Sequence, residues 1–473
     1  MTFLLYILVV YQVFMLLYFV VLNTGYTFVT LYAYLHIKNV AETAPDLDQL
    51  LTLTAISNLR PISIVVPAFN EELNICNTVI AATRVTYPEF EIIVVNDGST
   101  DATMTNLIER FDLVEIDRPA KTIIPTELVH KVYVSRSFPE LWVIDKENGG
   151  KADALNVGLS YSRFPLFCAV DGDSLLEADA LLRMGQQFLL NKELVAAGGA
   201  VRVLNGCVVE NSTVVKVRAP SNILAIIQIA EYLRGFLAGR IAWGEYNSLL
   251  IISGAFGVFR KDLLLAIDGY RKTVGEDMDL VLRLHRHCID NEIKYKVSFA
   301  SDPVCWTQVP SDLLTLLRQR NRWQRGLFDS LWHNRVMLFN PRYGRVGTIG
   351  LPCYLLFELL GPVIEFFGYF AFLVFFYFHL LNPLFVTLFL ITSVLWGMWL
   401  NAAAVLLDNH TICKYDKVRD VYKVALLGSL DYLGYRQLLA VERFIGTFQV
   451  WRSHWGKMNR KAIEQGENVA TTS

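Results

Sequence analysis

The chain has 473 residues, enough for two or three domains, and 53% of them are hydrophobic. That share is too high for an ordinary soluble enzyme and indicates a membrane protein with a soluble part. The formal net charge of −2 excludes the strongly basic balance of a nucleic-acid-binding protein, so no nucleic acid is expected as a partner. Seven scattered cysteines without a C-x-x-C pair predict neither a disulfide framework nor a zinc site.

The first segment predicts a membrane span. Residues 3–23 are uncharged and apolar, and the uncharged run continues to Ile37. We predict one long, tilted transmembrane helix over residues 1–37, because a hairpin here needs two very short spans. No basic stretch precedes it, so a cleaved signal peptide is not expected. Lys38 follows the span, which favours an outside N-terminus and a cytoplasmic domain after it.

Polar residues follow three predicted strands. A polar connector (40–60) leads to the strand 62–66, which ends in P-A-F-N-E-E, where Asn70 is expected to cap a helix. The strand 91–95 ends in N-D-G-S-T-D, and the apolar run 165–170 ends in D-G-D. This order predicts a doubly wound α/β sheet that binds ligands along the carboxyl ends of its strands.

The D-G-D at residues 171–173 is a candidate metal site. Its two carboxylates, Asp171 and Asp173, flank a residue without a side chain and can hold one divalent cation. Upstream, Gly149 and Gly150 precede Lys151, whose cation suits a diphosphate beside that metal. Taken alone, the D-x-D fits a surface loop equally well, and the aspartates of N-D-G-S-T-D fit a simple turn.

The order of the motifs resolves this ambiguity through a resemblance. VVPAFNEE, VVNDGSTD, DKENGGKADALN, VDGDS, ISGAFGVFR, GEDMDL and QRNRWQRG occur in sequence between Pro61 and Gly326. Together they resemble family-2 glycosyltransferases, and more narrowly the membrane-embedded branch that holds cellulose, hyaluronan, chitin-oligosaccharide and poly-N-acetylglucosamine synthases. The resemblance implies an α/β fold: a cytoplasmic GT-A (Rossmann-like) catalytic domain over 60–310, flanked by transmembrane and interfacial helices.

The resemblance also implies residues for a UDP-sugar donor. Asp97 and the loop after the first strand would contact uracil and ribose. Lys151 and Asp153 would line the nucleotide site. Asp171 and Asp173 would hold Mg²⁺ or Mn²⁺ on the diphosphate, where a cation neutralises the charge that grows on the departing UDP.

Acceptor and catalytic residues come from the later motifs. Asp277 matches the general base, supported by Glu276; Gly275 departs from the residue that precedes this pair in cellulose and hyaluronan synthases. In the Q-x-x-R-W signature, Arg322 would pair with phosphate oxygens of the donor. The remaining acceptor-binding residues implied by the resemblance are Gln319, Trp323, Ser253 and Gly254.

The rest of the chain is predicted to be membrane-associated. Residues 311–345 would form amphipathic interfacial helices that carry Q-x-x-R-W. Residues 350–408 would form a transmembrane hairpin that turns at Asn382-Pro383. Residues 409–461 are expected to be membrane-associated helices, spanning or interfacial, and 462–473 a disordered tail. The expected location is the cell (inner) membrane, multi-pass.

Two acidic residues stand out within the hairpin. Glu358 and Glu365 are the only formally charged residues between 350 and 407, and they lie two helical turns apart on one face. Either both pair with arginines of the interfacial helices, or they line a hydrophilic exit path for a glycan.

We interpret the chain as a metal-dependent inverting glycosyltransferase that uses a UDP-sugar to extend a β-linked polysaccharide. Secretion of the product by the same protein is an additional hypothesis. The resemblance favours N-acetylglucosamine. One alternative is transfer of a single sugar to a lipid or lipid carrier. Another is a non-catalytic membrane scaffold or transport component, which predicts loss of the carboxylates that are present here. Expected partners are the donor, a glycan or lipid acceptor, membrane lipids and accessory export proteins.

Overall fold

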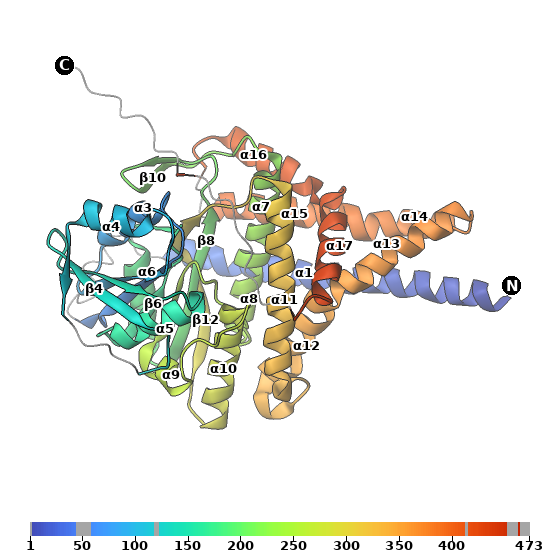
Figure 1. Cartoon of the computed structure of the whole chain (residues 1–473). Helices are drawn as coiled ribbons and strands as arrows, with labels where there is room; N and C mark the ends of the chain where they lie inside the picture. The colour runs from blue at the N-terminus through green and yellow to red at the C-terminus, as the bar shows by residue number, and fades with distance from the viewer. Residues whose placement is uncertain (1, 44–57, 118–122, 412–414, 452–461, 464–473) are drawn as a thin grey trace, which may run out of the picture.

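The computed structural model describes residues 2–43, 58–117, 123–411, 415–451 and 462–463. An α/β domain occupies one side of the molecule, and long helices project from the other (Figure 1). Of the predicted disordered tail, 462–473, residues 464–473 lie outside the described residues. Ile463 is instead buried, and its backbone N–H donates to Asn74 at 3.1 Å.

A ten-stranded mixed sheet forms the α/β domain, in the order β3-β4-β5-β2-β1-β6-β11-β8-β12-β7. Its four central strands, β5 to β6, run parallel, with Ile62 of β1 opposite Phe90 of β2 and Leu166 of β6. The carboxyl ends of these four strands therefore meet at one edge. In chain order the strands are β1 (Ile62–Ala68), β2 (Phe90–Asp97), β3 (Leu113–Ile116), β4 (Val129–Ser135), β5 (Leu141–Lys146), β6 (Leu166–Ala169), β7 (Leu175–Leu176), β8 (Leu194–Val203), β11 (Gly257–Arg260) and β12 (Lys296–Thr307).

Both faces of the central strands are buried, which explains their continuous apolar sequences. Along β1, Ile64 packs in one hydrophobic cluster and the next residue, Val65, packs in the other on the opposite face. The helices of this domain are α3 (Ile75–Thr83), α4 (Thr103–Phe111), α5 (Lys151–Tyr161), α6 (Ala180–Leu190), α9 (Lys261–Ala266) and α10 (Glu276–Asp290), and a small hairpin, β9 (Val208–Glu210) with β10 (Thr213–Lys216), stands apart. The predicted α/β fold class is confirmed.

One local prediction is wrong. Asn70 does not cap a helix: its side-chain oxygen accepts a hydrogen bond from the backbone N–H of Thr100 at 2.8 Å, and its own N–H donates to Ser99 at 3.0 Å. The helix α3 begins only at Ile75. Asn70 instead joins the loops that follow β1 and β2, in a left-handed conformation (φ 55°) that asparagine tolerates.

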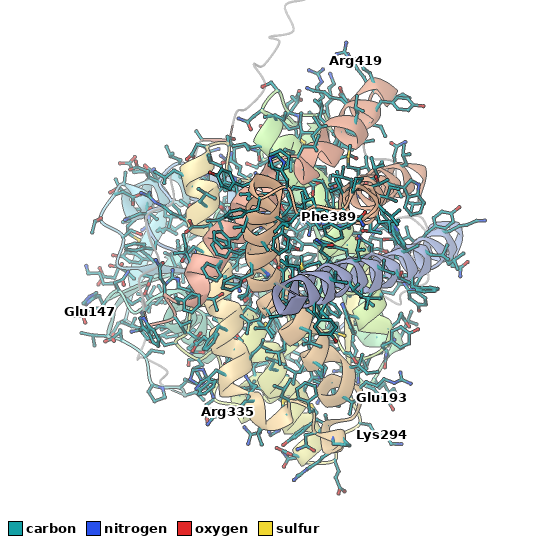
Figure 2. The ribbon with its side chains drawn as sticks, turned by 90° about the vertical axis from the view of Figure 1, so that its right-hand side faces the viewer. Glu147, Glu193, Lys294, Arg335, Phe389 and Arg419 are labelled. Carbon is teal, nitrogen blue, oxygen red and sulfur yellow. The ribbon has the colours of Figure 1, made fainter. Side chains whose placement is uncertain are left out.

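Within the part of the chain that the structure describes, three helical segments are long and apolar enough to cross a membrane: Tyr6–Asn39, Val346–Tyr377 and Pro383–Asn409. The first lies within one continuous helix, α1 (Thr2–Thr43). The other two form a hairpin made of η5 (Val346–Gly350), α12 (Leu351–Cys353), η6 (Tyr354–Leu359), α13 (Gly361–Tyr377), α14 (Pro383–Phe389), η7 (Leu390–Leu395) and α15 (Trp396–Thr411). Seen from the side of these helices, charged residues such as Glu193, Lys294 and Arg419 lie at the rim, whereas Phe389 lies among the helices (Figure 2).

Further helices connect the two parts. One continuous helical segment consists of α7 (Ile223–Glu231), η2 (Tyr232–Ala238) and α8 (Gly239–Glu245), and α11 (Leu313–His333) carries the Q-x-x-R-W motif. After α11 come the short turns η3 (Arg335–Met337) and η4 (Pro341–Tyr343). The C-terminal helices are α16 (Val418–Gly428), η8 (Ser429–Tyr432) and α17 (Tyr435–Thr447), and α17 packs on α11 and α13.

A buried ion pair also links the sheet to the membrane helices. The guanidinium of Arg202, on β8, donates two hydrogen bonds to the carboxylate of Asp408, on α15, at 2.6 and 3.0 Å. The side chains are 7% and 1% exposed. Such a bidentate ion pair fixes the orientation of β8 relative to α15.

Candidate active site

Asp97, at the end of β2, holds the loop at the carboxyl edge of the sheet in place. Asp97 is buried, and its carboxylate accepts hydrogen bonds from Lys146 at 2.7 Å and from the backbone N–H groups of Gly149 and Gly150 at 2.9 and 2.8 Å. Gly150 has φ +92°, a conformation that other residues avoid. These bonds shape the loop in front of α5, so that the first residue of this helix, Lys151, enters the cavity at the edge.

Lys151 connects the two acidic motifs. Its ammonium lies 2.6 Å from a carboxylate oxygen of Asp171 and 3.3 Å from one of Glu276. Burial alone lowers the pKa of Lys151, but these carboxylates outweigh burial and raise it overall. A side chain at Gly254 would place its Cβ 2.4 Å from this ammonium, so the small residue of the I-S-G-A-F-G motif makes room for the lysine.

Asp171 and Asp173 lie directly after β6 and line the same cavity. Burial and the neighbouring charge of Asp171 raise the pKa of Asp173 to about 7. Two hard carboxylates that repel each other suit a divalent cation. The described residues contain no group of three or more His, Cys, Asp or Glu side chains arranged for a metal. A cation here would therefore complete its coordination with oxygens of a ligand or water.

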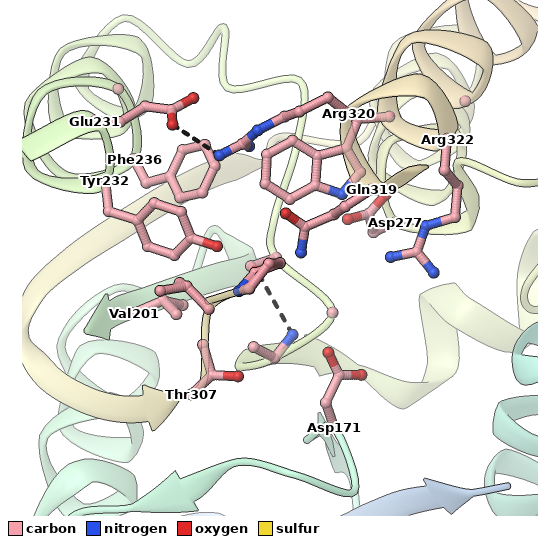
Figure 3. A pocket seen from close by; sticks show the side chains of 18 of the residues that line it. Asp171, Val201, Glu231, Tyr232, Phe236, Asp277, Thr307, Gln319, Arg320 and Arg322 are labelled. Atoms are coloured by element: carbon pink, nitrogen blue, oxygen red, sulfur yellow. Dashed lines mark hydrogen bonds and ion pairs between the residues drawn. The ribbon is translucent and has the colours of Figure 1, made fainter. Parts of the chain in front are cut away.

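The start of α10 supplies two more acids. Asp277 lines the cavity and accepts a hydrogen bond from the backbone N–H of Met278 at 2.8 Å. Glu276 is 5% exposed, and burial raises its pKa to about 7. From the facing helix α11, Gln319 and Arg322 point into the same space as Asp277, with Asp171 on the far side of it (Figure 3).

Trp323 is held by residues that the motif does not include. The guanidinium of Arg320 lies 4.1 Å from the Trp323 ring centre and forms an ion pair of 2.7 Å with Glu231 of α7. Phe236 also packs against Trp323, with ring centres 5.7 Å apart. No local pattern in the sequence predicts this support, because Glu231 is 89 residues from Arg320. These contacts fix the tryptophan ring as a flat wall of the cavity.

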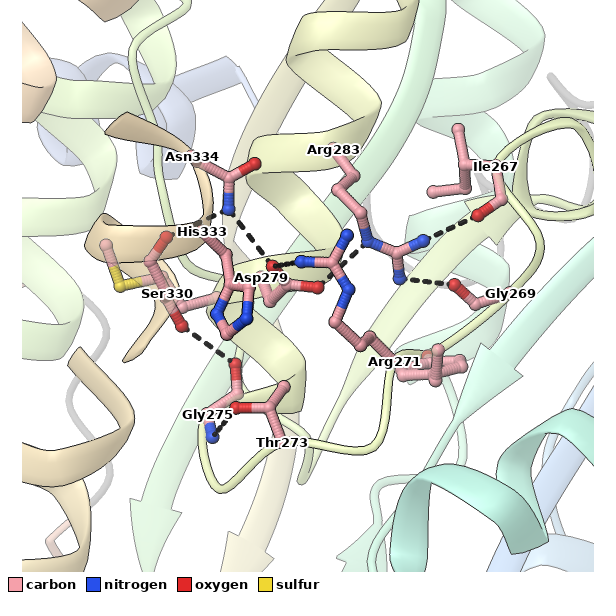
Figure 4. Close-up of polar contacts among 12 residues, drawn as sticks. Ile267, Gly269, Arg271, Thr273, Gly275, Asp279, Arg283, Ser330, His333 and Asn334 are labelled. Carbon is pink, nitrogen blue, oxygen red and sulfur yellow. Dashed lines mark hydrogen bonds and ion pairs between the residues drawn. The ribbon is translucent and has the colours of Figure 1, made fainter. Parts of the chain in front are cut away.

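A second network joins α10 to α11 (Figure 4). Asp279 is fully buried and accepts hydrogen bonds from Arg271 at 3.1 Å, Arg283 at 2.9 Å and Asn334 at 3.0 Å. The motifs do not predict this role for Asp279; the spacing of Asp279 and Arg283, one helical turn apart, is the only local signal. The hydroxyl of Ser330 also donates to the carbonyl of Gly275. The network holds the helix that carries Asp277 against the helix that carries Q-x-x-R-W.

All predicted site residues but one line a single cavity with a volume of about 2140 Å³. The exception is Asp153, whose carboxylate lies 2.7 Å from Lys146, behind the cavity wall. The predicted residues at the cavity are Asp97, Lys151, Asp171, Asp173, Ser253, Gly254, Glu276, Asp277, Gln319, Arg322 and Trp323.

The cavity continues from these residues to the membrane helices. Glu358 and Glu365 line its far end, together with Tyr26 of α1. Glu358 accepts a hydrogen bond from the Tyr26 hydroxyl at 3.2 Å and lies 3.4 Å from Arg443 of α17. Glu358 is therefore consistent with both expectations, because it pairs with an arginine and also lines the cavity.

Known sequences resemble this chain over most of its length. A poly-beta-1,6-N-acetyl-D-glucosamine synthase from Staphylococcus epidermidis is 26% identical over 355 residues, 75% of this chain and 71% of that protein. The protein of the same description from Staphylococcus aureus (strain COL) is 26% identical over 350 residues, 73% of this chain and 69% of its own.

A solved structure also aligns with most of this chain. A mannosyltransferase from Pyrobaculum calidifontis, in complex with GDP-Man and Mn²⁺, aligns with a TM-score of 0.50 and 17% identity. The alignment covers 92% of this chain and 98% of that one, and it supports the GT-A fold. The model described as "Glycosyl transferase family group 2" matches residues 171–400, and that of "Glycosyl transferase family 2" matches residues 63–120. The chain therefore carries glycosyl transferase family 2 domains and is a glycosyltransferase, with three candidate membrane spans among its described residues.

Proposed function

We propose that the protein is a metal-dependent, inverting synthase that transfers N-acetylglucosamine from its UDP donor to a growing β-linked polysaccharide. The observation that carries this proposal is the continuous cavity, which reaches from Asp171 and Asp277 to Glu358 and Glu365 between the membrane helices. The relatives described as poly-beta-1,6-N-acetyl-D-glucosamine synthases support the choice of sugar.

Residues at the carboxyl edge of the central strands bind the donor. Asp97 holds the loop that presents Lys151, and Lys151 with Arg322 from α11 supplies positive charge for a diphosphate. Asp171 and Asp173 would hold Mg²⁺ or Mn²⁺ there. When bound, the cation supplies charge that stabilises the departing diphosphate.

Residues at the start of α10 activate the acceptor. Asp277 takes the proton from the attacking hydroxyl of the acceptor as the new glycosidic bond forms. Attack on the anomeric carbon, opposite the departing UDP, inverts its configuration in one step. Glu276 and the Asp279 network keep Asp277 at the cavity wall, and Trp323 provides a flat surface on which a sugar ring stacks.

We propose that this chemistry takes place at the inner face of the cell membrane. The apolar helices supply three candidate spans. We propose that the α/β domain is cytoplasmic, where UDP-sugars are made, and that the product leaves along the cavity, with or without accessory export proteins.

The test is a donor panel on the purified full chain in liposomes. With Mn²⁺, UDP should be released from UDP-N-acetylglucosamine and not from UDP-glucose or UDP-glucuronate, and mass analysis should find a polymer of N-acetylhexosamine. The D277N variant is the matched control for background hydrolysis. A lipid-extractable product with one sugar would contradict the proposal.

A further inference from the structure

A stripe of side chains on the segment η2–α8 lines the cavity beyond the signature motifs. Tyr232, Phe236, Arg240 and Trp243 follow one another at intervals of four, four and three residues, so they share one helical face. All four line the cavity. A helix face that packs only against the protein core typically carries aliphatic residues. This helix face instead presents three aromatic rings and a guanidinium to the cavity.

The stripe spans the distance between the catalytic residues and the membrane helices. At one end, the ring of Phe236 lies 5.7 Å from that of Trp323. At the other end, the ring of Trp243 lies 6.3 Å from that of Tyr354, within the second candidate span. From Phe236 to Trp243 the helix rises about 10 Å. This length is comparable with two linked sugar rings.

Arg240 is the unusual member of the stripe. It is 5% exposed, and its guanidinium lies 4.5 Å from the ring centre of Phe236. Among the described residues, it forms no hydrogen bond or ion pair. Two other arginines at the cavity differ, because Arg320 pairs with Glu231 and Arg443 with Glu358.

Arg240 lines the cavity without a hydrogen-bond acceptor among the described residues. A guanidinium needs oxygen acceptors, and burial lowers the pKa of Arg240, with partial compensation from nearby groups that include Asp277. Water or a ligand in the cavity must therefore accept its hydrogen bonds. Sugars offer hydroxyl, ring and acetamide oxygens, and their apolar faces stack on aromatic rings.

We propose that Arg240, with Phe236 and Trp243, forms a binding subsite for the acceptor glycan, beyond the sugar that lies on Trp323. In this subsite the two rings stack on the glycan, and Arg240 donates hydrogen bonds to its oxygens. The inference rests on the proposed function. The subsite adds to that function that the enzyme recognises several units of its acceptor, and that this recognition favours continued elongation of one chain.

Soluble acceptors of different length test the subsite, with transfer followed as UDP release. The R240M variant should raise the KM for an N-acetylglucosamine trisaccharide by about tenfold, the loss expected for charged hydrogen bonds. The KM for the monosaccharide and for the donor should stay unchanged, and the polymer should become shorter. R335M is the matched control, because Arg335 also stacks on a tryptophan, Trp332 at 4.8 Å, but does not line the cavity.

Thermal unfolding separates this role from a structural one. Because R240M removes an uncompensated buried charge, its melting temperature should equal or exceed that of the wild type. A lower melting temperature with unchanged dependence on acceptor length would overturn the subsite. An equal loss with monosaccharide, or a raised donor KM, would overturn it as well. Wild-type protein that releases no UDP from UDP-N-acetylglucosamine would instead overturn the proposed function, and the subsite with it.

Discussion

Gly275 and Gly326 touch backbone to backbone, one residue before the Glu276–Asp277 pair and three residues after Trp323. A Cβ added to Gly275 would lie 2.6 Å from the carbonyl oxygen of Gly326, and one added to Gly326 would lie 2.9 Å from the Cα of Gly275. No side chain fits between them. The glycine that departs from the pattern of cellulose and hyaluronan synthases is therefore required here for the close approach of α10 and α11.

The first prediction follows from this contact. G275A should force the two helices apart, at a cost of about 1–3 kcal/mol in stability and with loss of transfer. The control is G350A, since a Cβ there meets its nearest neighbours at an ordinary 3.4 Å. Transfer rate and chemical unfolding measure the two effects. Equal behaviour of both variants would contradict the steric explanation.

The second prediction concerns the base. D277N should bind the UDP-sugar as the wild type does, because Asp277 acts on the acceptor, whereas transfer should fall by about 10²-fold or more. Calorimetric titration with donor and Mn²⁺ measures the first quantity, and UDP release the second. The role as general base is wrong if donor binding disappears along with turnover.

The metal site gives a third prediction. D173N should abolish transfer while leaving folding and membrane insertion intact, since one carboxylate of the clamp is lost. D179N is the control, because the partly exposed Asp179 at the start of α6 also loses an ion pair, with Arg183, but does not line the cavity. Turnover of D173N near the wild-type rate at saturating Mn²⁺ would exclude this residue as a ligand.

A fourth prediction tests the network around Asp279. D279N leaves Arg271 and Arg283 without their shared carboxylate, so the free energy of unfolding should fall by about 3 kcal/mol and transfer should decrease. D290N also removes an aspartate that pairs with two arginines, but at the surface, where about 1 kcal/mol or less is expected. Similar losses in both variants would show that burial of the network is unimportant.

Topology supplies the fifth prediction. A cysteine introduced at Leu380, near the turn of the hairpin, should react with an impermeant maleimide added from outside the cell. A cysteine introduced at Glu210, in the hairpin of the α/β domain, should react only after permeabilisation. Labelling in the reverse order would place the catalytic domain outside.

The sequence was sufficient to predict the parts of the structure that depend on local pattern. Unbroken apolar runs marked the central strands, and the chain's own strand order brought the loops after β1, β2 and β6 to one edge. Asn70 was misassigned because a contact 30 residues away, with Thr100, replaces the local cap. The role of Asp279 was missed for a related reason. What distinguishes this residue is its partners from distant segments, which periodicity does not encode.

The bidentate pair of Arg202 and Asp408 has a consequence for the order of synthesis. The two residues are 206 positions apart, and the second belongs to the last candidate span. While the ribosome extends the chain between them, β8 carries a buried guanidinium that lacks its counter-charge. The pair forms only after α15 has inserted with its C-terminal end facing the α/β domain. We expect a chain whose final hairpin inserts in the opposite orientation to leave Arg202 without this carboxylate, which would destabilise the sheet.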